Sequence, residues 1–237
     1  MALAAAIAIA LASCARIDGG TGTESSDGEG AVITTERTVR TNSKGQPIPD
    51  VLGDMTVELG PEPEAEKPIT NADSVRSYHN GHKALTYVNG SGKYRNLDGW
   101  GNEDRVDYLF DGKDGYFKPG EQSKLGGIVS NGELVIEFRT EKAVLVGYAF
   151  VTGNDSGNYK ERSPKEWYLY GSNDGKEWTL LDHVENSGIY AVDHGYFGYG
   201  IDESVRGEYS HYRVRFTKNI SDGQFGDFQL NEMYLYK

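Results

Sequence analysis

The chain has 237 residues, a formal net charge of −12 at neutral pH and one cysteine. This excess of negative charge disfavours nucleic acid, whose phosphates it would repel, and an anionic membrane surface as the main ligand. A single cysteine allows no disulfide within the chain, so the fold must be stabilised by its core, alone or with a metal. The 31 glycines and 16 tyrosines suit an all-β, loop-rich protein.

The N-terminal segment, residues 1–12, is apolar and carries no charge. It is shorter than the roughly 20 residues that a helix needs to span a bilayer. It leads into Leu11-Ala12-Ser13-Cys14, in which small residues precede a thiol that can be acylated. This pattern resembles a bacterial lipobox, in which a peptidase cuts before the cysteine and the cysteine receives the lipid.

The lipobox resemblance implies that residues 1–14 are a lipoprotein signal peptide and that Cys14 is the lipidation site. It also implies that the protein is anchored by lipid in a bacterial cell envelope, on the outer membrane or cell surface, and touches the membrane only through that anchor. The alternative is a cytosolic protein with an apolar tail and a chance cysteine.

Residues 15–67 contain few apolar side chains to bury. Residues 15–30 are rich in Gly, Ser, Thr, Asp and Glu, residues 31–40 have some β character, and prolines recur among charges in 41–67. This composition is typical of a flexible acidic linker. We expect it to contain at most one strand that docks on the following domain.

From residue 69 onward, short runs of branched and aromatic residues alternate with Gly-rich turns. Leu134, Ile136 and Phe138 alternate with their neighbours in the period-2 pattern of a strand with one face in a core. Ser130-Asn131-Gly132 is a turn signal before that strand. No amphipathic helix of useful length stands out. Short strands separated by turns indicate a β-sandwich.

A denser pattern lies in residues 167–182, where two strands rich in aromatic and branched residues flank Asn173-Asp174-Gly175. The Asp-Gly pair supplies the positive φ that a tight hairpin turn needs. The run from Trp167 through Trp178-Thr179 resembles the central hairpin of the discoidin domain, also called the coagulation factor V/VIII C-type domain. Other stretches resemble that family in the same order: residues 109–114, 132–138, 148–155 with 162–167, 209–216 and 229–236.

The discoidin resemblance covers residues 68–237 and implies an all-β fold, a jelly-roll β-sandwich of about eight strands, galactose-binding domain-like, preceded by the flexible tether. Members of the family usually bind surfaces and sugars and do no chemistry themselves. The resemblance therefore implies that the protein is not an enzyme and that its partner is a carbohydrate or surface glycan.

A calcium site is also implied, because in sugar-binding relatives a calcium ion sits between the early Asp-Gly turn and the closing strand. Carried over by position, the side chains are Asp111 and Glu232, and the carbonyls of Tyr108 and Lys113 complete much of the shell. Calcium tolerates such irregular oxygen shells. The alternative is that Asp111 caps its own turn and that Glu232 is an exposed strand residue.

Two long aromatic loops, Ser77–Asp107 and Glu185–Tyr209, are the predicted ligand-binding rim. Sugar rings stack on aromatic faces, while their hydroxyls need polar partners, and both loops offer the mixture. The predicted ligand-binding residues are Trp100 as first choice of platform, Tyr94, Arg95, His194, Tyr196 and Phe197. The alternative is that these rings plug the ends of the sandwich.

Remaining motifs favour structural roles. Asn154-Asp155 with Arg162 is interpreted as a charged brace of its loop, and the pair His79 and His82 is a weak zinc signal without further ligands. No catalytic motif is recognised. The sequence therefore predicts a carbohydrate-binding lipoprotein. A protein-binding adhesin or assembly partner is the alternative, and a glycoside hydrolase is the least favoured.

Overall fold

The structure is a computed structural model, and it describes residues 32–33, 57–58, 62–101, 103–189, 192–220 and 225–237. The chain divides into two compact units, Met1–Glu62 and Pro63–Lys237. In the first unit, β1 (Val32–Ile33) pairs antiparallel with β2 (Val57–Glu58), so the predicted linker contains two short paired strands where at most one strand was expected. Cys14 and the predicted signal peptide lie outside the described residues, as does most of the predicted linker.

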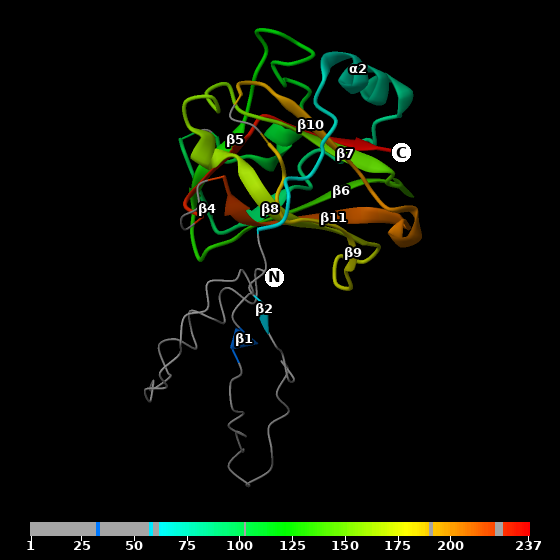
Figure 1. The fold of residues 1–237 in the computed structure, drawn as a ribbon. Coiled ribbons are helices and arrows are strands. Elements are labelled where there is room, and N and C mark those ends of the chain that lie inside the picture. The colour runs from blue at the N-terminus through cyan, green and yellow to red at the C-terminus, as the bar shows by residue number, and fades with distance from the viewer. Residues whose placement is uncertain (1–31, 34–56, 59–61, 102, 190–191, 221–224) are drawn as a thin grey trace. The chain divides into compact units, whose positions relative to one another are not determined.

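The second unit is built from three antiparallel sheets (Figure 1). The largest has the order β3-β6-β11-β8-β9, formed by Lys93–Arg95, Leu134–Val144, Glu208–Asn219, Pro164–Ser172 and Thr179–Val184. A second has the order β10-β7-β13, formed by Tyr196–Gly200, Gly147–Val151 and Glu232–Tyr236. The third has the order β12-β5-β4, formed by Asp227–Leu230, Leu125–Val129 and Leu97–Gly99.

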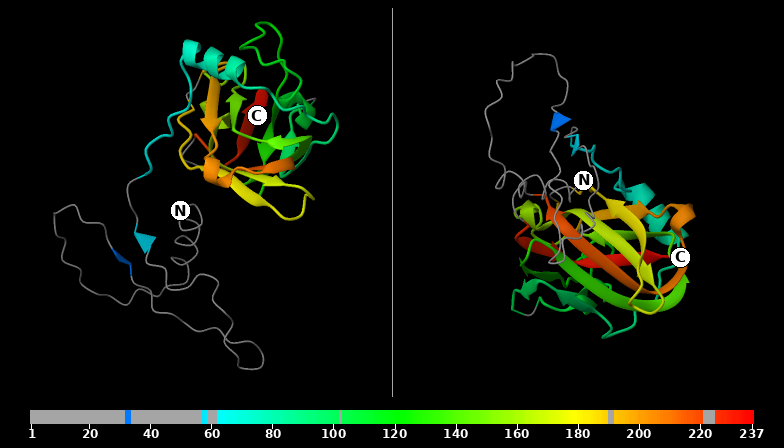
Figure 2. Two further views of the ribbon diagram at one scale, coloured as in Figure 1. Left: turned by 90° about the vertical axis from the view of Figure 1, so that its right-hand side faces the viewer. Right: turned by 90° about the horizontal axis from the view of Figure 1, so that it is seen from below.

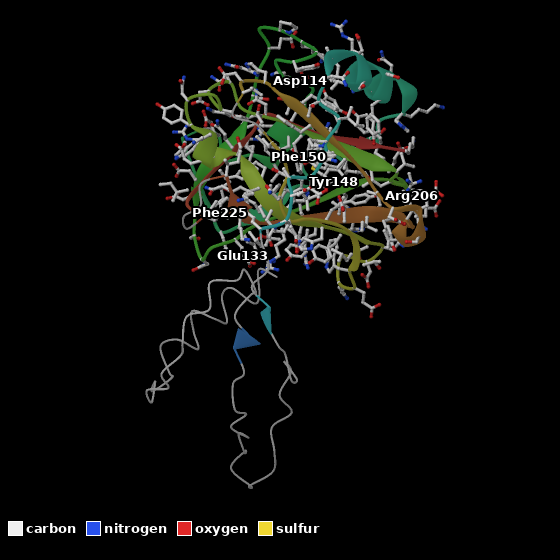
Figure 3. All side chains as sticks on the ribbon, viewed as in Figure 1. Asp114, Glu133, Tyr148, Phe150, Arg206 and Phe225 are labelled. Atoms are coloured by element: carbon white, nitrogen blue, oxygen red, sulfur yellow. The ribbon has the colours of Figure 1, made fainter. Side chains whose placement is uncertain are left out.

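One aromatic core joins the three sheets. Phe150 of β7 meets Trp167 of β8 edge-on, with ring centroids 5.1 Å apart. Phe216 of β11 packs against Phe228 of β12 at 4.8 Å. All four rings are buried, and Figure 3 shows Phe150 inside the layered domain. Burial of such large rings supplies the main stabilisation of a chain without disulfides. The predicted jelly-roll β-sandwich is thus confirmed.

The predicted strand pattern is confirmed with one exception. Leu134, Ile136 and Phe138 are buried, but so is Val135, which the alternation places on the outer face. The turn before this strand has positive φ at both Asn131 and Gly132. It connects β5 to β6, which belong to different sheets, so it is a crossover rather than a hairpin turn.

The β8–β9 hairpin forms as its sequence predicts. Gly175 has a φ of +68°. The Ser172 hydroxyl accepts hydrogen bonds from the backbone amides of Asp174 and Gly175, and the Asp174 carboxylate accepts from those of Lys176 and Glu177. The turn is therefore closed by its own side chains, as short polar residues in turns commonly do.

The helix α2 (Ala72–Gly81) corrects the expectation that this region is loop. Asn71 caps it by accepting a hydrogen bond from the amide of Ser74. Only Val75 is buried within it, so it lacks the broad apolar stripe that reveals an amphipathic helix in a sequence. Figure 2 shows it on the outside of the domain. Three 3-10 turns complete the described elements: η1 (Val106–Leu109), η2 (Lys160–Arg162) and η3 (Glu203–Val205).

None of the helices among the described residues is long and apolar enough to cross a membrane.

Residues 63–69, which we call the strap, join the domain before its first helix. The side-chain amide of Asn186 donates to the carbonyl of Pro63 at 2.8 Å, and the amide of Glu66 donates to the carbonyl of Asn186 at 2.5 Å. Ile69 exchanges two backbone hydrogen bonds with Gly198 of β10. The compact unit accordingly begins at Pro63, ahead of the predicted boundary at Pro68.

Candidate functional site

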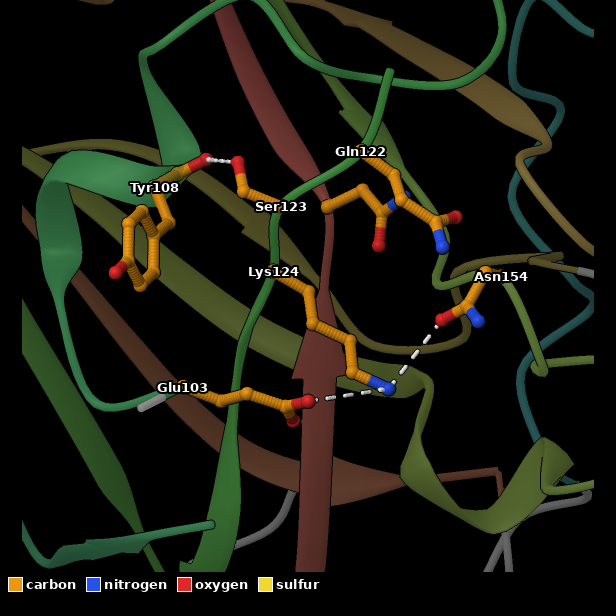
Figure 4. A pocket seen from close by; sticks show the side chains of 7 residues that line it. Glu103, Tyr108, Gln122, Ser123, Lys124 and Asn154 are labelled. Atoms are coloured by element: carbon orange, nitrogen blue, oxygen red, sulfur yellow. Dashed lines mark hydrogen bonds and ion pairs between the residues drawn. The ribbon is translucent and has the colours of Figure 1, made fainter. Parts of the chain in front are cut away.

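A polar pocket of about 250 Å³ opens at one end of the sandwich (Figure 4). Strand register brings its walls together, because the end of β4 pairs beside the start of β5 and the end of β7 pairs with the start of β13. The amide of Asn231, between β12 and β13, donates to the carbonyl of Val151 and joins the two small sheets at this end. The lining residues are Glu103, Tyr108, Gln122, Ser123, Lys124, Asn154 and Asn231.

Lys124, just before β5, is the central charge of the pocket. Its Nζ donates to Asn154 Oδ1 at 3.3 Å, and it lies 3.7 Å from Glu103 Oε1 and 3.6 Å from Asp155 Oδ1. Figure 4 shows the ammonium between Glu103 and Asn154. The pocket therefore presents a cation, a carboxylate and side-chain amides within reach of one small ligand.

Two buried acceptor atoms near Lys124 have no hydrogen-bond partner among the described residues: Asn231 Oδ1 and Asp155 Oδ1. Asn231 is 1% exposed and lines the pocket. Its side-chain nitrogen, Nδ2, donates to the carbonyl of Asp114 at 3.4 Å. A buried polar atom without a partner is costly, so such atoms indicate a place that water or a ligand fills.

Two aromatic rings outside the pocket lining pack on Arg162, and one of them, Trp100, lies against Gly126 together with Glu103 of the pocket. The Arg162 guanidinium lies over the ring of Trp100 at 4.5 Å and over that of Tyr159 at 3.8 Å. It also donates to Asp155 Oδ2 at 3.1 Å, which confirms the predicted charged brace of this loop. Trp100 is half-buried and packs on Gly126, and Tyr159 is 43% exposed. The ring of Trp100, the first choice of platform, therefore lies against the backbone of β5 instead of standing clear of it.

Burial corrects two of the predicted ligand-binding residues. Tyr196 and Phe197 are each 2% exposed and belong to the core, because residues 196–200 form strand β10 instead of continuing the predicted loop. Phe197 packs in the large cluster that contains Trp167, and the Tyr196 hydroxyl donates to that of Tyr236 at 3.1 Å. These rings plug the sandwich, and neither is available to stack on a ligand.

His194 is half-buried and acts on the pocket through Asn231. Its Nδ1 lies 3.1 Å from the amide nitrogen of Asn231 and 3.2 Å from the carbonyl oxygen of Asp114. Its φ of +52° is a left-handed backbone conformation that brings the ring against Gly115. His194 thus fixes the orientation of a pocket amide.

Tyr94 and Arg95 lie on β3 at the edge of the five-stranded sheet, paired with Ile136 and Val135. Tyr94 packs against the core, whereas Arg95 is exposed. Because part of the predicted loop Ser77–Asp107 is helix and strand, its polar and aromatic residues are distributed over several surfaces instead of forming one rim.

The predicted calcium ligands converge around Ser123. Its hydroxyl donates to Asp111 Oδ2 at 2.7 Å and reaches the carbonyl of Tyr108 at 3.5 Å, and its amide donates to the carbonyl of Lys113 at 3.1 Å. Asp111 Oδ1 also accepts from the amide of Lys113, so Asp111 does cap its own turn. Three of the four predicted groups, Asp111 and the carbonyls of Tyr108 and Lys113, thus lie around one loop end.

Glu232 is 2% exposed, which contradicts the alternative of an exposed strand residue. Burial raises the pKa of its carboxyl to about 9, and the nearby charges of Asp111 and Asp114 add to the effect. Its Oε2 has no hydrogen-bond partner among the described residues. A buried acidic oxygen beside a second carboxylate fits the donor set of a hard cation. No group of three or more His, Cys, Asp or Glu side chains in metal-binding geometry occurs in the part of the chain that the structure describes.

His79 and His82 belong to an aromatic cluster beside α2. His79 stacks on Phe117 at 4.0 Å and its Nδ1 lies 2.7 Å from the Tyr236 hydroxyl, while His82 packs on Tyr78 at 4.6 Å. Each ring has aromatic neighbours, as expected for histidines with structural roles.

Comparison with solved structures identifies the architecture. A two-domain structure, CBM32-1 and CBM32-2 of ZmpB from Clostridium perfringens, matches with a TM-score of 0.52 and 13% identity, covering 76% of this chain and 42% of that one. The domain has the discoidin-like, galactose-binding-like fold. Since identity is this low, the match establishes the fold alone.

Two other structures resemble the discoidin-like domain more weakly. CpGH89CBM32-5 from Clostridium perfringens, in complex with GalNAc-beta-1,3-galactose, has a TM-score of 0.49 and 12% identity, covering 65% of this chain and 100% of that one. A pectin-binding carbohydrate binding module has a TM-score of 0.47 and 14% identity, covering 65% and 92%. No known family model and no curated protein matches the chain.

Sequence reasoning missed most of the pocket of the discoidin-like domain. Lys124, Glu103 and Asn231 are isolated polar residues at strand ends, and only the register brings them together. Asn154 was noticed, but as part of the brace. The available signal was the position of Asn154 three residues after the end of β7, a strand of buried residues, because polar residues near strand ends commonly face a binding site.

Proposed function

We propose that this chain is a carbohydrate-binding protein without catalytic activity of its own and that the saccharide binds at the polar pocket. The observation that carries the proposal is the combination of Lys124, Glu103 and Asn154 with the aromatic side chain of Tyr108 in the lining of one cavity. Saccharide sites need charged and amide groups for hydroxyls and an aromatic surface for C–H groups. The shared fold of carbohydrate-binding modules supports the proposal.

The size of the pocket suits one saccharide residue at a chain end or branch. A cavity of about 250 Å³ is small for a ligand site and has room for a single ring. Each hydroxyl exchanges water for protein with little net gain, so we expect weak affinity for a free monosaccharide.

We propose further that Cys14 carries a lipid and displays the domain on a bacterial envelope. Support comes from the apolar run and the small residues before the only cysteine. The precursor and its Cys14→Ser variant should be expressed in a bacterial host and partitioned between detergent and water. The unaltered protein is expected in the detergent phase and the variant in water; equal partitioning of the two would refute lipidation.

Calcium is proposed as a structural cofactor. Asp111, Glu232 and the carbonyls of Tyr108 and Lys113 would hold it, and its charge would neutralise the two carboxylates. Ser123 already joins Asp111 to Tyr108 and also lines the pocket, so an ion there would stiffen one wall of the binding site.

A glycan array with the full chain tests the main proposal, using Asn154→Ala as the pocket variant and Asn80→Ala, exposed on α2, as the matched control. We expect the unaltered chain and the control to bind the same glycans and Asn154→Ala to bind none measurably. Binding that Asn154→Ala leaves intact would refute the pocket. Capture of a protein partner with no glycan bound would favour the adhesin alternative.

A further inference from the structure

The contacts of Lys124 differ from those of three other paired lysines in the domain, although Lys113 also lies 3.9 Å from its partner Asp111. The Lys124 Nζ stays 3.6 Å and 3.7 Å from two carboxylate oxygens although its side chain is only 16% exposed. Three other lysines, all with more exposed side chains than Lys124, contact carboxylate oxygens at 2.6–2.9 Å. These contacts are Lys93 with Glu137, Lys218 with Glu166 and Lys237 with Glu141. Lys124 is therefore held between two acids without a direct bond to either.

A ligand hydroxyl matches this open arrangement. A hydroxyl donates one hydrogen bond and accepts up to two, so it can accept from an ammonium while it donates to a carboxylate or amide oxygen. Here the ammonium is Lys124, and the acceptors are Glu103, Asn154 and the unpartnered Oδ1 of Asn231. Two neighbouring hydroxyls on one sugar ring would each donate a hydrogen bond to a different one of these acceptors, on two sides of Lys124.

The charges of the pocket disfavour a charged ligand. The second cation nearby, Arg162, is 18% exposed and already bonded to Asp155 and stacked on two rings. A ligand carboxylate would find only Lys124, whose charge two acids already offset, and would be repelled by Glu103. A ligand ammonium would face Lys124 itself. Like charges brought together in a partly dehydrated pocket should lower the affinity tenfold or more.

We propose that the pocket selects an uncharged saccharide residue that presents two adjacent hydroxyls, and that it rejects the corresponding uronic acid and amino sugar. This inference rests on the proposed function, because it names the ligand class of the same site.

The test uses matched ligands and the full chain. Neutral hexoside, uronic acid and amino sugar are compared in the gluco, galacto and manno series, so that each charged member differs from the neutral one at a single carbon, C6 in the uronic acid and C2 in the amino sugar. Binding is followed by NMR through the backbone amides of Ser123, Lys124 and Asn154. In each series that binds, we expect the neutral member to bind at least tenfold more tightly than either charged member.

Two variants connect the selectivity to its residues. Glu103→Gln keeps the shape but removes the repelling charge, so it should reduce the discrimination against the uronic acid several-fold. Lys124→Met keeps the unbranched stem of the side chain but removes the ammonium, and should reduce binding of the neutral member at least tenfold. Glu203→Gln and Lys142→Met, both on exposed side chains, are the matched controls and should change neither ratio.

The outcomes separate this inference from the proposed function. Equal or tighter binding of a uronic acid or an amino sugar would overturn the inference and leave carbohydrate binding in place. Unchanged discrimination in a correctly folded Glu103→Gln chain, judged by its NMR spectrum, would also overturn it. If no member of any series shifts the three amides, both the inference and the pocket of the proposed function are wrong.

Discussion

The guanidinium of Arg162 lies 4.5 Å from the ring of Trp100, next to the polar pocket. The same group donates to Asp155 at 3.1 Å and so ties the segment after β4 to the loop after β7. A second pair of this kind, Arg213 over Trp178 at 4.2 Å, lies at the β8–β9 hairpin, and neither of its members lines the pocket. Trp100 and Arg162 do not line the pocket either, but they adjoin residues of the Lys124 site, because Trp100 and Glu103 both lie against Gly126 and Asp155 lies between Arg162 and Lys124. The domain thus contains two chemically similar pairs, of which this one lies next to the pocket.

These pairs allow a matched test of Trp100. Trp100→Ala and Trp178→Ala each remove a half-buried ring and a cation–π contact, so each should lower the free energy of unfolding by about 1–3 kcal/mol. Only Trp100→Ala should also abolish saccharide binding on the glycan array. Urea unfolding measures the first effect. Equal loss of binding in both variants would show that Trp100 acts through stability alone.

Much of the fold could be predicted because its signals are local. The turn at Asp174-Gly175 needs a positive φ that its own sequence supplies, and the alternation of Leu134, Ile136 and Phe138 is visible within one strand. Helix α2 was missed because it buries only Val75 and so gives no apolar periodicity.

The site was harder to predict because its residues are not neighbours in sequence. Lys124 and Asn231 meet only after β5 and β13 find their partners. Tyr196 and Phe197 were misplaced because an aromatic, Gly-rich stretch is compatible with both a binding loop and a buried strand, and pairing of β10 with β7 decides between the two. Composition of a segment cannot show which of its rings face inward.

Calcium is expected to stabilise the domain through Asp111 and Glu232. An ion that binds only the folded state adds about 2.7 kcal/mol at a hundredfold excess over its dissociation constant, which for a domain of this size is a rise in melting temperature of roughly 5–10 °C. Asp111→Ala and Glu232→Gln should lose this rise, whereas Glu203→Gln, an exposed control, should keep it. Identical melting curves of the unaltered chain in calcium and in chelator would contradict the site.

Acidification should weaken the packing of α2 through His79. Burial lowers the pKa of this imidazole below 6.5, although the charge of Asp114 opposes the shift. Because the folded-state pKa is the lower one, the neutral form contributes stability above pH 6.5, and that contribution is lost as pH falls through the folded-state pKa.

The melting temperature of the unaltered chain should therefore decrease on acidification from pH about 7.5 to about 5 by more than that of His79→Gln. His82→Gln is the control. This histidine follows His79 by three residues and belongs to the same aromatic cluster, and its variant should keep the full decrease in melting temperature. If His79→Gln shows the same pH dependence as the unaltered chain, His79 is not the responsible group.

The strap should prove to be an integral part of the domain. A chain that starts at Thr70 loses the hydrogen bonds of Pro63 and Glu66 with Asn186 and the packing of Ile69 on β10. At about 1 kcal/mol for each of these two net hydrogen bonds and of the two that Ile69 exchanges with Gly198, and about 1–2 kcal/mol for a partly buried Ile, it should be less stable by about 5–6 kcal/mol than a chain that starts at Pro63. Urea unfolding of the two chains measures the difference.

A substitution on the opposite side of the same contact gives an independent test. Gly188 has a φ of +60°, and a Cβ added there would lie 2.4 Å from the carbonyl oxygen of Glu66. Gly188→Ala therefore combines backbone strain with a clash against the strap. Without the strap only the strain remains, so the substitution should cost less in the chain that starts at Thr70. An equal cost in both chains would show that the strap does not rest on Gly188.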